Sequence, residues 1–169
     1  MPESDNHIAF IAVGSNQGDK TANCRFGIEG MEQPGRCRVT GRSRFFRTAP
    51  VDYLNQDWFI NAAFRVETRW SPRELLENLK IVQKKAGRTQ SPIRFGPRVL
   101  DLDIIFYDDL VLSSEDLTLP HPRMHKRRFV LEPLCDIDPR VVHPVLKQDL
   151  KRLLDAIDDP GQEIFPLND

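Results

Sequence analysis

The chain has 169 residues, of which 40% are hydrophobic and 29% are charged, and its formal net charge is −1 at neutral pH. This is the size of one compact domain that buries a core without disulfide or metal staples, so we expect a single domain over residues 1–169. No apolar run approaches the roughly 18 residues that a membrane-spanning helix requires. We therefore expect a soluble protein with no membrane partner.

The start of the chain and its cysteines bear on its location. The first ten residues, MPESDNHIAF, lack the basic start and the long apolar run of a secretory signal, so we expect a cytoplasmic protein. Cys24, Cys37 and Cys135 are odd in number and far apart, and they form no CxxC pair. We expect them to be buried thiols.

The first half of the chain predicts three strands and a helix. Residues 7–13, HIAFIAV, are a nearly continuous apolar run, which is typical of a central buried strand. A helix is expected from about Thr21 to Met31, and the alternating residues 37–47 predict a second strand. A long loop over residues 48–57 then leads to a third strand over residues 58–68, WFINAAFRVET.

The second helix has the clearest start signal in the sequence. Ser71 is a good N-cap, Pro72 suits the first helical position, and Glu74 completes a capping box. An apolar face follows. The cap alone contributes about 1 kcal/mol to the stability of the helix. We therefore expect a helix that starts at this point.

The second half predicts one more strand and a terminal helix. Residues 88–98 contain two prolines and a glycine, which favours a mobile surface loop before a fourth strand over residues 99–107. A turn after this strand permits a short hairpin with residues 110–112, and residues 149–157 predict an amphipathic helix. The element order is a duplicated split βαβ unit, which predicts an α+β fold: a mainly antiparallel four-stranded sheet with helices against one face. Because this topology hosts many functions, the function has to be inferred from the site.

Positive charge gathers in three segments that contain no carboxylate: residues 33–50, 84–98 and 121–128. The three segments could converge on an anion. Alternatively, each is a solvated face that pairs with acids elsewhere in the chain.

Two like charges lie unusually close together in the fourth predicted strand. Asp101 and Asp103 point to the same face, about 6.6 Å apart along the chain. Ile105 and Tyr107 continue this face with apolar side chains. The opposite face is expected to carry Leu100, Leu102 and Ile104. Two carboxylates beside a buried core are costly unless something neutralises them.

Two kinds of partner would neutralise the aspartates. One is an ion pair with Arg94 and Arg98. The other is Mg²⁺, which prefers oxygen ligands and usually shares one or two carboxylates with substrate phosphates. Two such ions about 4 Å apart are suited to displacement at phosphorus, and nearby arginines could bind phosphate oxygens in forked geometry.

One objection to a specific assignment is that metal-dependent nucleotidyltransferases also combine Gly-Ser with D-x-D. Here Gly14 and Ser15 precede Asp101 by more than eighty residues, whereas in those enzymes the two motifs are neighbours in sequence. This separation disfavours the nucleotidyltransferase interpretation. A Walker P-loop is also absent from the sequence.

Five motifs occur in one order along the chain: GSNQGD, RTAP, AGR, RFGPRVLDLDI and LPHPRMHKRRFVLEPL. With these motifs the chain resembles the 6-hydroxymethyl-7,8-dihydropterin pyrophosphokinases of folate synthesis over about residues 8–139. The resemblance implies a ferredoxin-like sandwich with long mobile catalytic loops. It also implies Mg²⁺-dependent transfer of pyrophosphate from ATP to the hydroxymethyl group of the pterin, which releases AMP.

For the nucleotide, the resemblance implies a metal site and a set of cations. Asp101 and Asp103 would hold two Mg²⁺ ions that bridge the ATP phosphates, and Arg88 and Arg98 would be catalytic arginines that bind the phosphates near the transition state. The other ATP contacts are expected from Gln83, Arg94, Ile104, Thr118, His121 and Arg127.

For the pterin, the resemblance implies that Asn61 hydrogen-bonds the ring edge and that Phe59 and Phe129 stack on the ring. By composition alone, these two phenylalanines would be ordinary core residues. The remaining pterin contacts are expected from Thr48, Val51, Phe95 and Asp101.

The chain departs from the family pattern at two positions. Gln83 stands where the family commonly has glutamate, and Gln90 stands where some members have arginine, so nucleotide contacts or loop closure could differ. ATP and 6-hydroxymethyl-7,8-dihydropterin are the expected partners of a monomer that binds no nucleic acid.

Two rival functions remain open at this stage. A small RNA-binding module could stack bases on basic, aromatic strands such as residues 42–47, RSRFFR, although the RNP1 pattern is missing. A different two-metal nucleotidyl or phosphoryl transferase would share the chemistry but act on another acceptor.

Overall fold

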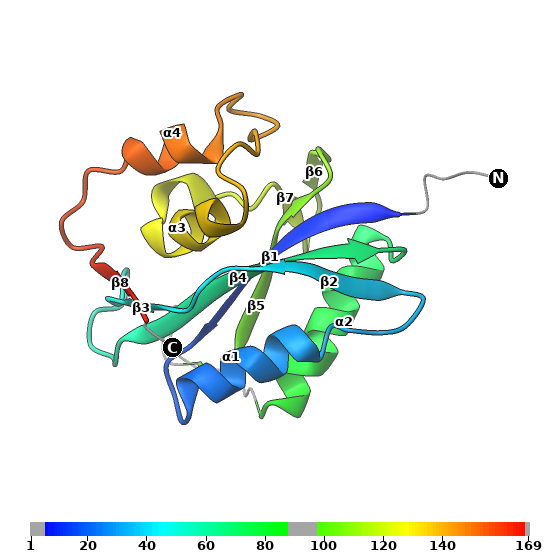
Figure 1. Ribbon diagram of the computed structural model, residues 1–169, viewed down its shortest axis with the longest axis horizontal. Helices are drawn as coiled ribbons and strands as arrows, with labels where there is room; N and C mark the ends of the chain where they lie inside the picture. The colour runs from blue at the N-terminus through cyan, green and yellow to red at the C-terminus, as the bar shows by residue number, and fades with distance from the viewer. Residues whose placement is uncertain (1–5, 88–97, 168–169) are drawn as a thin grey trace.

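An antiparallel six-stranded sheet organises the computed structural model, which describes residues 6–87 and 98–167 (Figure 1). The central strands are β1 (His7–Ser15) and β4 (Phe59–Thr68), which pair along their whole lengths. β5 (Asp101–Tyr107) pairs with the other side of β1 and forms one edge of the sheet. The α+β class and the antiparallel core predicted from the sequence are confirmed.

The far side of the sheet is built by short strands on β4. β2 (Cys37–Arg42) pairs with one half of β4 and β3 (Phe46–Thr48) with the other, so the single strand expected over residues 37–47 is divided in two. β8 (Ile164–Pro166) pairs with β3 and brings the C-terminal part of the chain to this edge.

Helices cover both faces of the sheet (Figure 1). α1 (Lys20–Glu29) and α2 (Pro72–Lys85) pack on one face over the larger core cluster. α3 (Arg128–Ile137) and α4 (Leu150–Asp155) pack on the other face over a second cluster. The expectation of helices against one face only is therefore wrong, because α3 was not foreseen. Its start has no side-chain cap and Pro133 lies inside it, so the usual helix signals are missing.

The predicted capping box is present at the start of α2. The Ser71 hydroxyl accepts from the Glu74 N–H at 3.2 Å, and the Glu74 carboxylate accepts from the Ser71 N–H at 2.9 Å. Cys24 and Cys37 are buried as expected, whereas Cys135 is half-buried. No helix within the described residues is long and apolar enough to span a bilayer.

A β-bulge in β5 changes which residues share a face. Phe10 pairs with Phe106 whereas Ile11 pairs with Ile104, so Ile105 is an extra residue in β5. After the bulge, Tyr107 belongs to the core under α1 and α2, and its hydroxyl donates to the Trp70 carbonyl at 2.6 Å. The prediction that Tyr107 lies on the face of the aspartates is thus wrong, while Ile105 does lie on that face.

The short hairpin expected after β5 also differs. β6 (Leu112–Ser113) pairs with β7 (Thr118–Leu119) as a separate ribbon and does not pair with β5. A short 3₁₀ helix, η2 (Met124–Lys126), then precedes α3.

A side chain from α2 supports the edge strand β5. The Leu102 N–H, between the two aspartates, donates to Oε1 of Gln83 at 2.9 Å, and Gln83 is only 6% exposed. An edge strand presents N–H groups that lack a neighbouring strand. The buried amide of Gln83 therefore satisfies one of these groups.

We expect Gln83→Met to lower the free energy of unfolding by about 1–3 kcal/mol, because it leaves the buried Leu102 N–H without its acceptor. Urea denaturation of the variant beside wild type measures this loss. Lys84→Met places the same side chain at the next, exposed position and serves as the control. Equal stabilities of the two variants would contradict a structural role for the amide.

Candidate active site

A pocket of about 410 Å³ opens on the face of the sheet that α3 covers in part. Ala12 and Gly14 of β1 and the two aspartates of β5 form its floor. One wall comes from residues 48–52, and the other comes from residues 121–130. The pocket therefore joins segments that are far apart in the sequence.

The aspartates stand next to the smallest residues of the floor. Asp101 is paired with Gly14 and Asp103 with Ala12 across the β1–β5 ladder. Because these partners carry little or no side chain, space remains above the sheet beside both carboxylates. The bulge lies C-terminal to this pair, so the spacing predicted for a regular strand holds here.

The chemistry of this carboxylate pair suits a hard cation. Within residues 6–87 and 98–167, no cluster of three or more His, Cys, Asp or Glu side chains could hold a metal ion. Two carboxylates on one strand fit Mg²⁺ because this ion usually keeps several waters and takes further oxygen ligands from substrate phosphates. A zinc site of His and Cys ligands does not fit this donor set.

Cationic side chains line the side of the pocket near the aspartates. Arg98, Arg123 and Arg127 line it together with His121. Burial lowers the pKa of Arg127, and the nearby carboxylates of Asp52, Asp103 and Asp101 oppose this shift. Arginine nonetheless stays charged in proteins. This side of the pocket can therefore bind an anion with several oxygen atoms.

His121 is held in its neutral form. Burial, followed by the charges of Arg127 and Arg123, lowers the pKa of His121 to about 4. The Arg123 N–H donates to His121 Nδ1 at 3.2 Å, so the ring proton is on Nε2. The neutral ring can thus donate a hydrogen bond to an anion without carrying a charge itself.

The other end of the pocket is polar and aromatic. Asn61 Nδ2 donates to Thr48 Oγ1 at 2.7 Å, and both residues are buried. This bond fixes the amide so that Oδ1 faces Gly14 on the pocket floor. Phe59 from β4 and Phe129 from α3 also line the pocket. An amide and two aromatic rings in one place can bind a flat, polar ring.

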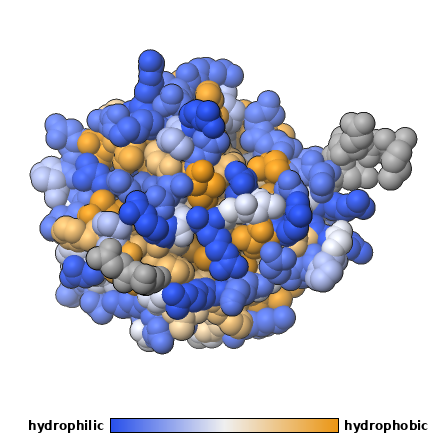
Figure 2. Space-filling model, viewed as in Figure 1, coloured by the Kyte–Doolittle hydropathy of each residue, from blue (hydrophilic) through white to orange (hydrophobic). Residues whose placement is uncertain are grey.

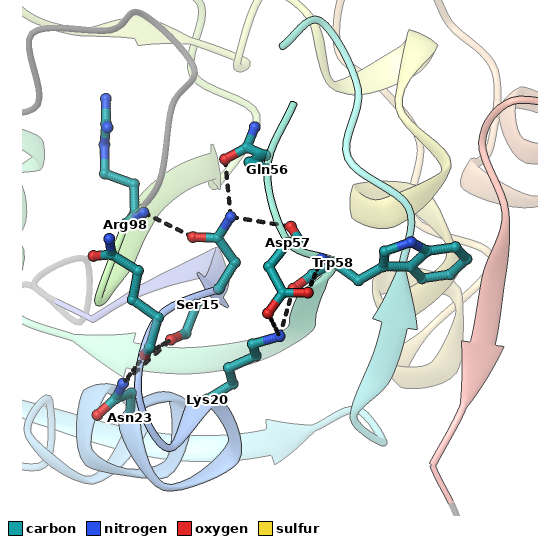
Figure 3. A network of polar contacts seen from close by, with 9 residues as sticks. Ser15, Lys20, Asn23, Gln56, Asp57, Trp58 and Arg98 are labelled. Atoms are coloured by element: carbon teal, nitrogen blue, oxygen red, sulfur yellow. Dashed lines mark hydrogen bonds and ion pairs between the residues drawn. The ribbon is translucent and has the colours of Figure 1, made fainter. Parts of the chain in front are cut away.

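A buried amide joins the segments around the pocket. Asn16 is 3% exposed, its Oδ1 accepts from the Arg98 N–H at 2.8 Å, and its own N–H donates to the Arg98 carbonyl at 3.0 Å. Its Nδ2 donates to Gln56 Oε1 at 2.8 Å and to the Asp57 carbonyl at 3.2 Å. Figure 3 shows Gln56, Asp57 and Arg98 converging at this point.

The end of the loop over residues 49–58 is held by a second set of contacts. Lys20 Nζ donates to Asp57 Oδ2 at 3.0 Å and to the Trp58 carbonyl at 2.9 Å (Figure 3). The Arg47 guanidinium lies 4.0 Å from the centroid of the Trp58 ring, and Phe165 of β8 stacks on the same ring at 6.2 Å. The loop that forms one wall of the pocket is thereby fixed at its C-terminal end.

Comparison with known proteins agrees with this geometry. The family model described as 7,8-dihydro-6-hydroxymethylpterin-pyrophosphokinase (HPPK) matches residues 10–139. The chain belongs to the HPPK family. The matched segment includes every described residue that lines the pocket.

Named relatives fall into single-enzyme and longer proteins. The chain is 41% identical to the 2-amino-4-hydroxy-6-hydroxymethyldihydropteridine pyrophosphokinase of Bacillus subtilis over 78% of each chain. It is 37% identical to the protein of that name from Methylorubrum extorquens over 92% of this chain and 96% of that one. It is also 39% identical to the folic acid synthesis protein FOL1 of Dictyostelium discoideum, but spans only 22% of that protein.

Solved structures support the HPPK fold. The wild-type Plasmodium falciparum HPPK-DHPS crystallised with pteroate matches with a TM-score of 0.73 at 14% identity. The match covers 92% of this chain and 43% of that one. At this identity the likeness concerns the fold alone.

The pocket brings together most of the site residues predicted from the sequence. Those that line it are Thr48, Val51, Phe59, Asn61, Arg98, Asp101, Asp103, His121, Arg127 and Phe129. Their individual roles stay predictions. Arg88, Arg94 and Phe95, as well as Gln90, lie outside the described residues.

Three residues that were predicted to contact the nucleotide do not line the pocket. Gln83 is buried beneath β5, where its oxygen accepts from Leu102. Ile104 is 3% exposed in the core under α1 and α2, and Thr118 is exposed in β7. Since a glutamate at position 83 would also offer an oxygen acceptor, the departure from the family pattern preserves this contact.

The structure bears on both rival interpretations. The segment RSRFFR is interrupted between β2 and β3, Phe46 is 2% exposed, and Phe45 packs against the core, so these rings form no open platform for bases. Gly14, by contrast, lies directly beside Asp101 in the sheet. The long separation in sequence therefore does not exclude a nucleotidyltransferase. Membership of the HPPK family is the observation that disfavours it.

Residues that line the pocket but were not predicted as site residues include Ala12, Gly14, Asp52 and Arg123. Arg123 lies within a basic segment that the sequence analysis identified, so a signal for it was available. Gly14 belongs to the GSNQGD motif, so a signal for it was available as well, whereas Ala12 gave no signal because its contribution is only a small side chain.

We expect Gly14→Ala to lower the free energy of unfolding by about 1–3 kcal/mol, because the new Cβ would clash with Asn61 Oδ1. Urea denaturation measures this loss. Asn61→Ala removes the obstructing atom. Gly14→Ala should therefore lower the free energy of unfolding by less in that background than in wild type. Equal costs in the two backgrounds would contradict the steric explanation.

We expect the free energy of unfolding to fall by up to about 3 kcal/mol through His121 as the pH drops from about 6.5 to about 4. Between these values the unfolded chain binds a proton that the half-buried ring of the folded chain does not bind. The pH profiles of wild type and His121→Asn in urea denaturation isolate this effect, since Asn keeps an acceptor for the Arg123 N–H. Parallel profiles would contradict the lowered pKa.

Proposed function

We propose that the chain transfers pyrophosphate from ATP to the hydroxymethyl group of 6-hydroxymethyl-7,8-dihydropterin, with Mg²⁺ as the metal. The observation that carries the proposal is that one pocket joins Asp101 and Asp103, a cationic wall and an amide with two aromatic rings. These parts match the needs of a metal, a polyphosphate and a flat polar ring. Membership of the HPPK family supports the same reaction.

In the proposed reaction, the hydroxymethyl oxygen attacks the β-phosphorus of ATP. The bond between this phosphorus and the oxygen that bridges to the α-phosphorus breaks, AMP leaves, and the hydroxyl proton passes to solvent. Bound Mg²⁺ at Asp101 and Asp103 would offset the negative charge of the phosphates. Little covalent chemistry is left to side chains, so catalysis depends on positioning and charge.

The protein's own groups would divide this task between the two ends of the pocket. Arg98 and Arg127 would bind phosphate oxygens, and neutral His121 would donate a further hydrogen bond. Asn61 Oδ1 would accept from N–H groups on the pterin edge while Phe59 and Phe129 contact the ring faces.

Several finer assignments stay predictions from the sequence. These are the number of two Mg²⁺ ions, the monomeric state, the cytoplasmic location and the phosphate contacts of Arg88 and Arg94. The chain spans 22% of the first fungal and amoebal relatives, which are named folic acid synthesis proteins.

The reaction can be tested by mixing the purified protein with ATP, Mg²⁺ and reduced 6-hydroxymethylpterin and separating the nucleotides by chromatography. We expect AMP that appears only when the pterin is present. Pterin-dependent ADP would instead indicate a γ-phosphoryl kinase, and the absence of turnover would contradict the proposed function.

We expect Asp103→Asn to reduce kcat by about 10²-fold or more, because the nearly isosteric amide removes a metal-binding charge. Turnover measured over a Mg²⁺ series, with urea denaturation to verify folding, provides the measurement. Asp109→Asn alters an exposed carboxylate in the turn after β5 and serves as the control. Unchanged turnover of Asp103→Asn at low Mg²⁺ would refute the metal assignment.

A further inference from the structure

A carboxylate of the pocket wall faces the cationic side. Asp52 lies in the loop over residues 49–58 and lines the pocket, and its Oδ2 is 3.4 Å from an Nη of Arg127. The Arg127 side chain is 16% exposed, whereas that of Asp52 is 46% exposed. The more solvent-exposed partner of this ion pair is therefore the aspartate.

The backbone at Asp52 is strained in a way that fixes the direction of its side chain. Its φ is +64°, in the left-handed region that non-glycine residues rarely adopt. The Tyr53 N–H donates to the Val51 carbonyl at 2.7 Å, which closes a three-residue turn around Asp52. A turn with this hydrogen bond and a positive φ has the features of the uncommon γ-turn form. Strained backbone of this kind persists only when its surroundings hold it, and it gathers at functional sites.

Asp52 and a bound phosphate would compete for the same guanidinium. Arg127 lies on the wall that faces Asp101 and Asp103, where the proposed function places the polyphosphate. A phosphate oxygen that binds the Nη now facing Asp52 has to displace this carboxylate or tolerate its negative charge. Both effects weaken anion binding, while in the absence of the anion the ion pair keeps Arg127 directed into the pocket.

We propose that Asp52 is a positioning residue that holds Arg127 in the pocket and competes with the polyphosphate for it. This inference rests on the proposed function, since it assumes that Arg127 binds phosphate. It predicts a gain of affinity on removal of a pocket residue, which the loss of a merely structural contact would not produce.

The test uses two substitutions at Asp52. Asp52→Asn removes the charge but keeps a residue that tolerates a positive φ, and Asp52→Gly removes the side chain while relieving the backbone strain. If the carboxylate is the cause, both variants bind phosphate more tightly. Asp116→Asn is the matched control, because Asp116 is 43% exposed, pairs with Arg73 at 3.0 Å and lies away from the pocket.

Calorimetric titration with the Mg²⁺ complex of α,β-methylene-ATP gives Kd without turnover. We expect Kd to fall about 3- to 10-fold in Asp52→Asn and Asp52→Gly and to stay unchanged in Asp116→Asn. In an Arg127→Ala background, or in Arg127→Gln if the alanine variant does not fold, the gain should shrink or vanish. An unchanged or increased Kd, or a gain that persists in full without the guanidinium, would overturn the inference.

Titration with inorganic tripolyphosphate separates this inference from the proposed function. If the wild type binds tripolyphosphate but not the nucleotide, the proposed function fails, while tighter tripolyphosphate binding by Asp52→Asn still supports competition at Arg127. Equal Kd values for tripolyphosphate in wild type and Asp52→Asn would refute the competition even if the enzyme makes AMP.

Discussion

The arrangement of the pocket depends on the hydrogen bonds of one buried amide, that of Asn16. An asparagine side chain offers both a carbonyl acceptor and two N–H donors, and this amide uses both kinds of group at once. It ties Arg98, three residues before β5, to the loop that contains Gln56 and Asp57. An aspartate would lack the donors and a leucine would lack both, so few side chains could link these segments while buried.

The hydrogen bonds of Asn16 matter for the proposed reaction because they join two segments that form the pocket. The segment that follows Arg98 carries the aspartates of the pocket floor, and the loop over residues 49–58 contributes to one wall. Transfer of a pyrophosphoryl group between two bound substrates requires that both be held at a defined separation. Hydrogen bonds from one buried side chain, which does not itself line the pocket, hold both segments at a fixed separation. The tightly packed core on the far face of the sheet supports the floor beneath it.

Local signals in the sequence were reliable where they act over a few residues. The Ser71 capping box and the apolar run of β1 predict their elements correctly, because capping and strand burial leave a direct pattern in the sequence. The bulge at Ile105 and the helix that starts at Arg128 were missed. Both depend on packing between distant segments, and neither has a distinctive local pattern.

The candidate site shows the same difference between features with a local sequence signal and features that depend on distant segments. Asp101 and Asp103 attract notice from spacing and charge alone, because two carboxylates on one strand face demand neutralisation. Asn61, Phe59 and Phe129 were expected only through the family resemblance. Phenylalanine is ordinary in a core, and a single asparagine within a predicted strand forms no recognisable pattern. The pairing of Asp52 with Arg127 joins positions far apart in the chain and depends on an unusual φ, which no sequence pattern specifies.

The stack of Arg47, Trp58 and Phe165 gives the protein an optical reporter of its own. The chain has two tryptophans, and Trp70 is 5% exposed in the core on the opposite face of the sheet. Trp58, by contrast, lies at the end of the loop that forms a pocket wall, beside a guanidinium and a phenylalanine ring. Fluorescence of the indole is sensitive to such neighbours, so a shift in emission on ligand binding reports on this loop and on the docking of the C-terminal strand, with no added label.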